Sequence, residues 1–181
     1  MNRAETIIQL YNKHGSRDYI GEGMTQTAHA LQCAYHARHR YPDDADIILA
    51  ALLHDIGHIL YFDQETTDTM GAYGINRHED KGASYLSALG YNERICAMVR
   101  NHVAAKRYLC STSKEYYENL SHASKTTMRY QGGMMTLQEQ QEFMYSPYFA
   151  DSIKIRYLDD MGKDAPGLDY GRIEDYRELL K

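Results

Sequence analysis

The sequence has 181 residues, of which 43% are hydrophobic and 25% are charged. This length and composition are typical of a globular protein, and we expect one domain over residues 1–181. The formal net charge of −5 argues against a nucleic-acid partner, because nucleic-acid binding normally needs a basic patch. No apolar run approaches the roughly 20 residues of a membrane span, and the N-terminus lacks the apolar core of a signal peptide. We therefore expect a cytoplasmic protein without a membrane or protein partner.

Helical periodicity runs through the whole chain. Apolar residues recur at spacings of three and four, and Val99 and Val103 are the only valines, so an extensive sheet is not expected. The sequence predicts an all-α helical bundle of about seven to nine helices. The expected helices cover residues 3–14, 25–40, a stretch that ends at the HDIGH segment (54–58), 78–89, 92–105, 113–130, 136–145, 147–160 and 172–180.

The three cysteines do not form a recognisable motif. Cys33, Cys96 and Cys110 are widely spaced and odd in number, and no CxxC pair occurs. We interpret them as reduced thiols of the core rather than as a disulfide framework or a zinc site.

The segment LAALLHDIGH (49–58) ends an apolar helical run in two adjacent polar residues, His54 and Asp55, and His58 follows one turn later. Adjacent side chains cannot share one face of a regular helix, so a common partner requires a distorted or capped turn. A metal ion is such a partner, because iron, manganese and zinc accept imidazole and carboxylate ligands. The alternative is a plain helix C-terminus, where Gly57 loosens the last turn and His58 faces the negative end of the dipole.

Other polar residues lie at the ends or on the inward faces of separate expected helices. A single histidine is usually a surface or hydrogen-bonded residue, but helical bundles build metal sites from one inward ligand on each of several helices. Near the C-terminus, Arg156 and Asp159 share a helix face three residues apart. The candidate set comprises His29, His54, Asp55, His58, His78, His102, Lys106 and Asp159.

His29, the His54-Asp55 pair and Asp159 resemble the H…HD…D signature of the HD-domain superfamily, all-helical metalloproteins best known as phosphohydrolases. The resemblance extends to the PhnZ/TmpB group, HD-domain mixed-valent di-iron oxygenases that degrade organophosphonates. The matching segments are YIGE (19–22), LQCAY (31–35), LAALLHDIGH (49–58), GAYGINRHE (71–79), HVAAKRYL (102–109), YQGG (130–133) and KIR..D (154–159).

This resemblance implies a buried binuclear metal site with two iron ions, Fe(II) and Fe(III), and O2 as co-substrate. The carboxylate of Asp55 would bridge the two irons. Zinc and manganese accept the same ligand types, so residue chemistry alone leaves the metal open. The other ligands would be His29, His54 and Asp159 for one iron and His78 and His102 for the second.

The resemblance also implies catalytic roles for Tyr19, Glu22 and His58. Tyr19 is similar to a tyrosine that occupies an iron position until the substrate displaces it. Glu22 would pair with this tyrosine and then face the cationic nitrogen of the substrate. A simple loop hydrogen bond and surface ion pairs are the structural alternatives for these polar residues. Glu22 would bind the cationic end of the substrate. The residues that would bind its phosphonate group are His58, Lys106, Ser124 and Arg156.

The implied reaction is oxidative cleavage of the C–P bond of a small organophosphonate, a 1-hydroxy-2-aminoethylphosphonate type of molecule. A trimethylammonio substrate, (R)-1-hydroxy-2-(trimethylammonio)ethylphosphonate, would give glycine betaine and phosphate, and a primary amine would give glycine. The abundance of tyrosine favours the quaternary ammonium group, which prefers aromatic faces. A metal-dependent HD phosphohydrolase of nucleotides or phosphate esters is the alternative enzyme, and a non-enzymatic binding module is the alternative outside enzymes. His58 favours the oxygenase, since many binuclear HD phosphodiesterases have lysine in its place.

Overall fold

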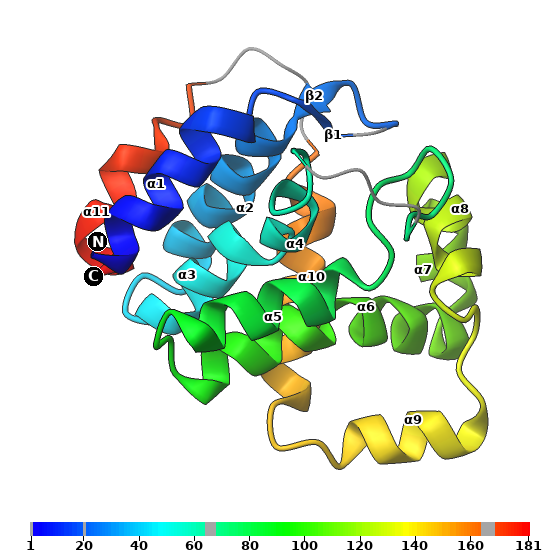
Figure 1. The fold of residues 1–181 in the computed structure, drawn as a ribbon. Helices are drawn as coiled ribbons and strands as arrows, with labels where there is room; N and C mark the ends of the chain where they lie inside the picture. Colours follow the sequence, from blue (N-terminus) through cyan, green and yellow to red (C-terminus); the bar gives the residue numbers. More distant parts are fainter. Residues whose placement is uncertain (1, 20, 64–67, 164–168) are drawn as a thin grey trace.

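The computed structural model describes residues 2–19, 21–63, 68–163 and 169–181, and the described chain is predominantly helical, as the all-α prediction requires (Figure 1). Ile20 of the YIGE segment, residues 64–67 and residues 164–168 lie outside the described residues. The main helices are α1 (Arg3–His14), α2 (Gln26–Arg40), α3 (Ala45–Leu53), α4 (Ile56–Ile59), α5 (His78–Ala88), α6 (Glu93–Thr112) and α10 (Phe149–Met161).

Smaller elements surround this bundle. A two-residue antiparallel pairing joins β1 and β2 ahead of α2, and further short helices follow α6 and close the chain. The termini lie side by side, because α1 packs against α11 (Figure 1). The bounds of these elements are β1 (Asp18–Tyr19), β2 (Met24–Thr25), α7 (Lys114–Asn119), α8 (His122–Tyr130), α9 (Leu137–Met144), η1 (Ile173–Tyr176) and α11 (Arg177–Leu180).

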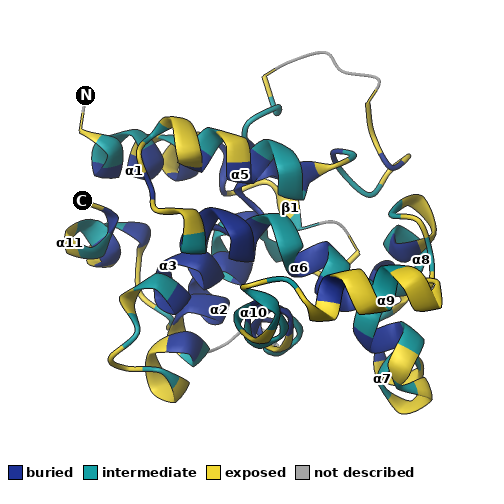
Figure 2. Cartoon of the chain, turned by 90° about the horizontal axis from the view of Figure 1, so that it is seen from below, coloured by how far each residue is buried: buried dark blue, intermediate teal, exposed yellow. Residues whose placement is uncertain are grey.

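Helix α3 is the centre of the core. Every residue from Ile47 to Leu53 is buried, and the helix packs against α2, α6 and α10. Each fully buried Leu or Ile contributes roughly 1.5–3 kcal/mol to the hydrophobic free energy of folding. Buried residues gather on α3 and on the sides of α2 and α6 that face it, whereas α7 and α9 are largely exposed (Figure 2). The apolar run before HDIGH is therefore a helix that is buried all round.

Local sequence signals set several helix ends. The side chain of Thr25 accepts a hydrogen bond from the backbone N–H of Ala28 and caps α2, and Asp44 caps α3 in the same way through Ile47. Gly90 follows α5 with a φ of +82°, the left-handed conformation that glycine adopts at helix C-termini. These local signals fix the starts of α2 and α3 and the end of α5.

Several predicted boundaries were wrong. The helix predicted over 92–105 continues to Thr112, because no glycine or proline ends it. The helix predicted over 113–130 is two helices, α7 and α8, since Leu120 adopts an extended backbone and Ser121 caps α8. The short β1–β2 pairing was not predicted. Among the described residues, no helix has the length and apolar character needed to cross a membrane.

Gly57 permits the close approach of α4 to the start of α5. A Cβ atom built on Gly57 would lie 1.9 Å from the carbonyl oxygen of His78, a backbone atom that cannot move without shifting α5. The contact explains why glycine stands between Asp55 and His58.

We predict that Gly57→Ala lowers the free energy of unfolding by about 3 kcal/mol, because overpacking forces these two backbones apart. Gly90→Ala is the matched control: its φ is positive but no atom lies within 4 Å of the added Cβ, so the loss should be about 1 kcal/mol. Urea unfolding measures both. Equal losses in the two variants would contradict the packing role of Gly57.

Candidate metal centre and adjoining cavity

The break between α3 and α4 positions the His54-Asp55 pair. His54 ends α3 with helical dihedral angles, and Asp55 leaves the helix with φ −99° and ψ 10° before α4 resumes at Ile56. The interruption turns both side chains toward one buried space, where the Nε2 atom of His54 lies 3.3 Å from Oδ2 of Asp55. This is the distorted turn that a shared partner of adjacent side chains requires.

Side chains from three helices converge on the Oδ2 side of Asp55. His29 of α2 brings its Nε2 atom within 3.1 Å of His54 Nε2 and 3.6 Å of Asp55 Oδ2. Oδ1 of Asp159, from α10, lies 3.4 Å from His29 Nε2 and 3.9 Å from His54 Nε2. Two imidazole nitrogens and two carboxylate oxygens from separate elements thus face one point.

A second cluster forms on the other oxygen of the same carboxylate. His78 begins α5 and His102 lies in α6, and their Nε2 atoms are 3.1 Å apart. They lie 3.3 Å and 3.4 Å from Oδ1 of Asp55. Asp55 therefore presents one oxygen to each pair of histidines, which is the arrangement of a bridging carboxylate.

Backbone hydrogen bonds fix the tautomers of three of these histidines. The Nδ1–H groups of His29, His54 and His102 donate to the carbonyl oxygens of Gly162, Ala51 and Val99 at 2.9, 2.9 and 2.7 Å. A neutral imidazole that donates from Nδ1 has a free lone pair on Nε2, the tautomer that metal ligands need. In the neutral form of each ring, the Nε2 atom consequently points its lone pair into the site.

The donor set fits two metal ions. Facing lone pairs only about 3 Å apart repel unless a cation lies between them, and ligand bonds of about 2.1 Å at a right angle place donors at that separation. Oδ1 of Asp159 is buried and accepts no hydrogen bond from the described residues, although a buried carboxylate oxygen normally has a partner. Imidazole and carboxylate suit iron, manganese and zinc alike.

The charges in the protein without metal support the same conclusion. Burial lowers the pKa of His54, but the Asp55 and Asp159 carboxylates outweigh it and raise this pKa to about 9. Burial raises the pKa of Asp55, but its histidine partners outweigh burial and hold it well below its usual range. The carboxylates thus stay ionised, and in the protein without metal their negative charge favours a proton on His54. A metal cation would compensate the same negative charge.

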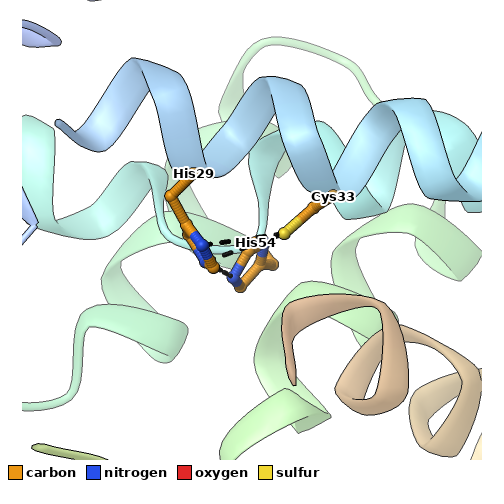
Figure 3. A group of neighbouring side chains, drawn as sticks. All are labelled: His29, Cys33 and His54. Carbon is orange, nitrogen blue, oxygen red and sulfur yellow. Dashed lines mark hydrogen bonds between the residues drawn. The ribbon is translucent and has the colours of Figure 1, made fainter. Parts of the chain in front are cut away.

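Cys33 lies beside the first cluster. Its Sγ atom is 3.7 Å from His29 Nε2, and Figure 3 shows Cys33 and His29 pointing from one side of α2 toward His54. Burial and the nearby carboxylates raise the pKa of the thiol well above its usual value, so the thiol is protonated in the protein without metal. With His29 and His54 it forms a buried group whose ligand atoms lie close enough together to hold a metal ion. Cys33, Cys96 and Cys110 are all buried and free, as the sequence predicted.

A cavity of about 350 Å³ opens on the two clusters. This volume suits a small ligand, since binding sites for small molecules begin at about 300 Å³. The structure brings together around it most of the side chains that were predicted to bind substrate or metal. The lining includes Tyr19, Glu22, Asp55, His58, His78, His102, Lys106, Ser124, Arg156 and Asp159.

His58 and Lys106 can both donate hydrogen bonds into this cavity. The ring of His58 stacks on His78 at 3.9 Å, and its Nδ1 atom accepts a hydrogen bond from the Ile75 N–H, so Nε2 carries the hydrogen. Burial lowers the pKa of His58 well below 6.5, which keeps the ring neutral. Lys106 donates to Thr127 Oγ1 at 3.1 Å, and burial lowers the pKa of its ammonium to about 7.

Arg156 is held by carboxylates on its own helix. Its Nη1 atom donates to Oδ2 of Asp159 at 2.5 Å, its Nη2 atom pairs with Asp160, and Nε donates to the hydroxyl of Tyr116 at 2.7 Å. The pairing with Asp159 at a spacing of three residues agrees with the sequence prediction. The guanidinium therefore positions a candidate metal ligand as well as placing positive charge at the cavity.

Tyr19 and Glu22 reach the site from the β1–β2 turn. The Tyr19 ring stacks on His29 with centroids 4.0 Å apart, and burial together with the Asp55 charge raises the pKa of its hydroxyl well above 10. The Glu22 carboxylate accepts a hydrogen bond from Ser121 at 2.6 Å, and its backbone N–H donates to the carbonyl of Tyr19. Glu22 is thus fixed in the loop at one end of the cavity.

The sequence prediction missed polar residues around the cavity. Lys163 contacts Ser124 and Glu22, and Gln26 and Thr127 also line or border the space. Lys163 follows Asp159 by four residues, and this helical spacing was the one signal that could have found it. Gln26 and Thr127 had no such signal, because their contacts depend on how α2 and α8 pack.

Comparison with known proteins agrees with the fold and the site. The HD domain family model matches residues 26–137, more than half of the chain. The chain therefore belongs to the HD-domain family.

The relatives narrow this assignment. The chain is 38% identical to the [1-hydroxy-2-(trimethylamino)ethyl]phosphonate dioxygenase (glycine-betaine-forming) of Leisingera caerulea, over 91% of this chain and 82% of that protein. It is 35% identical to the hydroxymethylphosphonate dioxygenase of Gimesia maris, over 96% and 84%. An uncharacterized protein of Acanthamoeba polyphaga mimivirus is 42% identical over 99% and 81%. Within the HD-domain family, the chain belongs to the PhnZ-like oxygenases.

We predict that Asp55→Ala abolishes the pairing of the two metal ions, because Asp55 is the carboxylate that lies beside both histidine clusters among the described residues. Metal analysis of the purified variant should find at most one bound metal ion per chain. His39→Ala is the control, since His39 is exposed and bonds only locally to Tyr35. Full metal content in Asp55→Ala would contradict the bridging role.

Proposed function

We propose that this protein is a mixed-valent di-iron oxygenase that cleaves the C–P bond of a 1-hydroxy-2-aminoethylphosphonate type of substrate. The favoured substrate is (R)-1-hydroxy-2-(trimethylammonio)ethylphosphonate, which would yield glycine betaine and phosphate. The primary-amine analogue, yielding glycine, is the second candidate. One observation carries the proposal. The Asp55 carboxylate lies between two histidine pairs and lines a cavity that is also lined by cations and hydrogen-bond donors.

The reaction balances without an external reductant. One hydroxyphosphonate and one O2 give one carboxylic acid and one phosphate, so the C–P bond and the C1–H bond break while new C–O and P–O bonds form. Two iron ions would activate O2. One would be held by His29, His54 and Asp159, the other by His78 and His102, and Asp55 would be a ligand of both. The residues of the chain bind and orient the substrate and exclude competing water.

The phosphonate end of the substrate would meet Lys106, His58 and Ser124. The Lys106 ammonium has Thr127 as a neutral partner, so a phosphonate dianion would be its strongest electrostatic partner in the cavity and would restore its full charge. His58 donates from Nε2, and the hydroxyl of Ser124 adds a third donor. Charge-assisted hydrogen bonds of this kind are about twice as strong as neutral ones.

The cationic end would meet Glu22 and aromatic rings. Tyr61, Phe62 and Tyr73 line the cavity together with Glu22. A quaternary ammonium group binds over aromatic faces with about 0.5–2 kcal/mol per favourable contact. Tyr19, stacked on His29, lies where a substrate that enters between Glu22 and the metal ligands would displace it.

The decisive experiment compares turnover with and without oxygen. The iron-loaded protein is expected to release phosphate from the two hydroxyphosphonates in air, consuming one O2 per phosphate, and to release none under strict anaerobiosis. An oxygen electrode and a phosphate assay measure the two quantities. Phosphate release without O2 would instead indicate a metal-dependent phosphohydrolase, which uses a metal-activated water.

We predict that Lys106→Met raises KM for the phosphonate by about tenfold or more, because it removes the buried cation closest to the anion. The melting temperature should not fall, since burial that lowers the pKa of the ammonium to about 7 is a cost to the folded state. Lys125→Met on α8 is the control, because Lys125 is half-buried outside the cavity lining and donates to the carbonyl oxygen of Glu118. An unchanged KM would show that Lys106 does not contact the substrate.

A further inference from the structure

Lys163 contacts three residues that line the cavity and has no part in the function proposed above. It follows the C-terminus of α10, and its side chain is only 13% exposed. Its Nζ atom lies 3.1 Å from Ser124 Oγ, 3.8 Å from Glu22 Oε1 and 3.6 Å from Asp159 Oδ1. One ammonium therefore touches the predicted phosphonate donor, the carboxylate of the cationic end and a candidate metal ligand.

The contact with Ser124 determines the direction of its hydroxyl. An ammonium only donates hydrogen bonds, so Ser124 Oγ must accept from Lys163. The O–H of Ser124 is then available to donate to an anion in the cavity. Lys163 thus affects the binding of the phosphonate group through Ser124. This effect is the same whether or not the other end of the substrate is charged.

The contact with Glu22 has a different consequence. The Glu22 side chain is only 12% exposed, and its other polar partner, the hydroxyl of Ser121, is neutral. A buried carboxylate without a compensating charge is costly. When the substrate brings a cation, that cation compensates Glu22; when it does not, Lys163 is the ammonium nearest to this carboxylate among the described contacts.

We propose that Lys163 is a specificity-determining residue that lets this cavity accept hydroxyphosphonates with and without a cationic group. The inference rests on the proposed function, because it concerns the same cavity and the same substrate class. Lys163 compensates Glu22 when the bound hydroxyphosphonate is neutral at that end, and it shares Glu22 with the substrate nitrogen when that end is cationic.

The test is anaerobic binding of two ligands by the iron-loaded protein. Titration calorimetry gives the Kd of 1-hydroxy-2-(trimethylamino)ethylphosphonate, which is cationic, and of hydroxymethylphosphonate, which is not. Lys163→Met should shift the ratio of the two Kd values by about tenfold or more toward the cationic ligand. The effect through Ser124 is common to both ligands and cancels in the ratio.

Two further variants separate charge from structure. Lys163→Arg keeps the cation and should hold the ratio within about threefold of the original. Lys154→Met is the matched control, because Lys154 lies on the same helix but pairs with Asp151 away from the cavity. An unchanged ratio in Lys163→Met, with full iron content, would overturn the inference.

A double variant covers the case in which Lys163→Met alone does not fold. Lys163→Met in a Glu22→Gln background leaves no uncompensated carboxylate at position 22, and its Kd ratio should equal that of Glu22→Gln alone. A tenfold difference between those two would overturn the inference, since Lys163 would then act without Glu22. If the original protein releases phosphate from neither ligand in air, the proposed function fails instead, so the two failures are distinguishable.

Discussion

The carboxylate of Asp55 is the constraint on which the rest of the structure depends. Its two oxygens lie between two pairs of imidazole nitrogens at 3.3–3.6 Å, and four helices must meet for these contacts to exist. The meeting requires α3 to end where it does and α4 to approach α5 over Gly57. The apolar side chains of α3 hold the end of the helix at this meeting point, because they are buried against α2, α6 and α10.

Electrostatic compensation organises the space beside the metal ligands. Three buried or nearly buried cations, Arg156, Lys106 and Lys163, surround a site rich in carboxylates. The three cations differ in their partners. Arg156 pairs with the carboxylates of Asp159 and Asp160, and Lys106 donates to a hydroxyl group. Lys163 contacts carboxylates and a hydroxyl group. A cationic metal centre would compensate Asp55 and the Oδ1 atom of Asp159, which accepts no hydrogen bond from the described residues. An anionic substrate would compensate Lys106, whose hydrogen-bond partner is the neutral Thr127 hydroxyl.

Much of the fold follows from local signals. The helical spacing of apolar residues correctly indicated an all-α bundle, and the structure shows local caps at Thr25 and Asp44 and a left-handed glycine at Gly90 after α5. Prediction failed where local signals were weak. Leu120 and Ser121 interrupt the helix predicted over 113–130 without glycine or proline. Leu120 is buried in a cluster with Cys110 of α6 and Met128 of α8, and Ser121 caps α8.

The sequence alone determined which residue types could form the centre. A histidine and an aspartate in succession at the end of an apolar run, with histidines at the ends of other helices, limited the chemistry to metal ligation or helix capping. Only the tertiary structure decided which atoms meet, because many of the contacts join residues far apart in the sequence, such as His29 with His54 and with Gly162. It also decided which groups Cys33 and Lys163 contact. Each lies four residues after a candidate ligand, His29 or Asp159, but the contact of Cys33 with His54's neighbour His29 and those of Lys163 with Ser124 and Glu22 are known only from the tertiary structure.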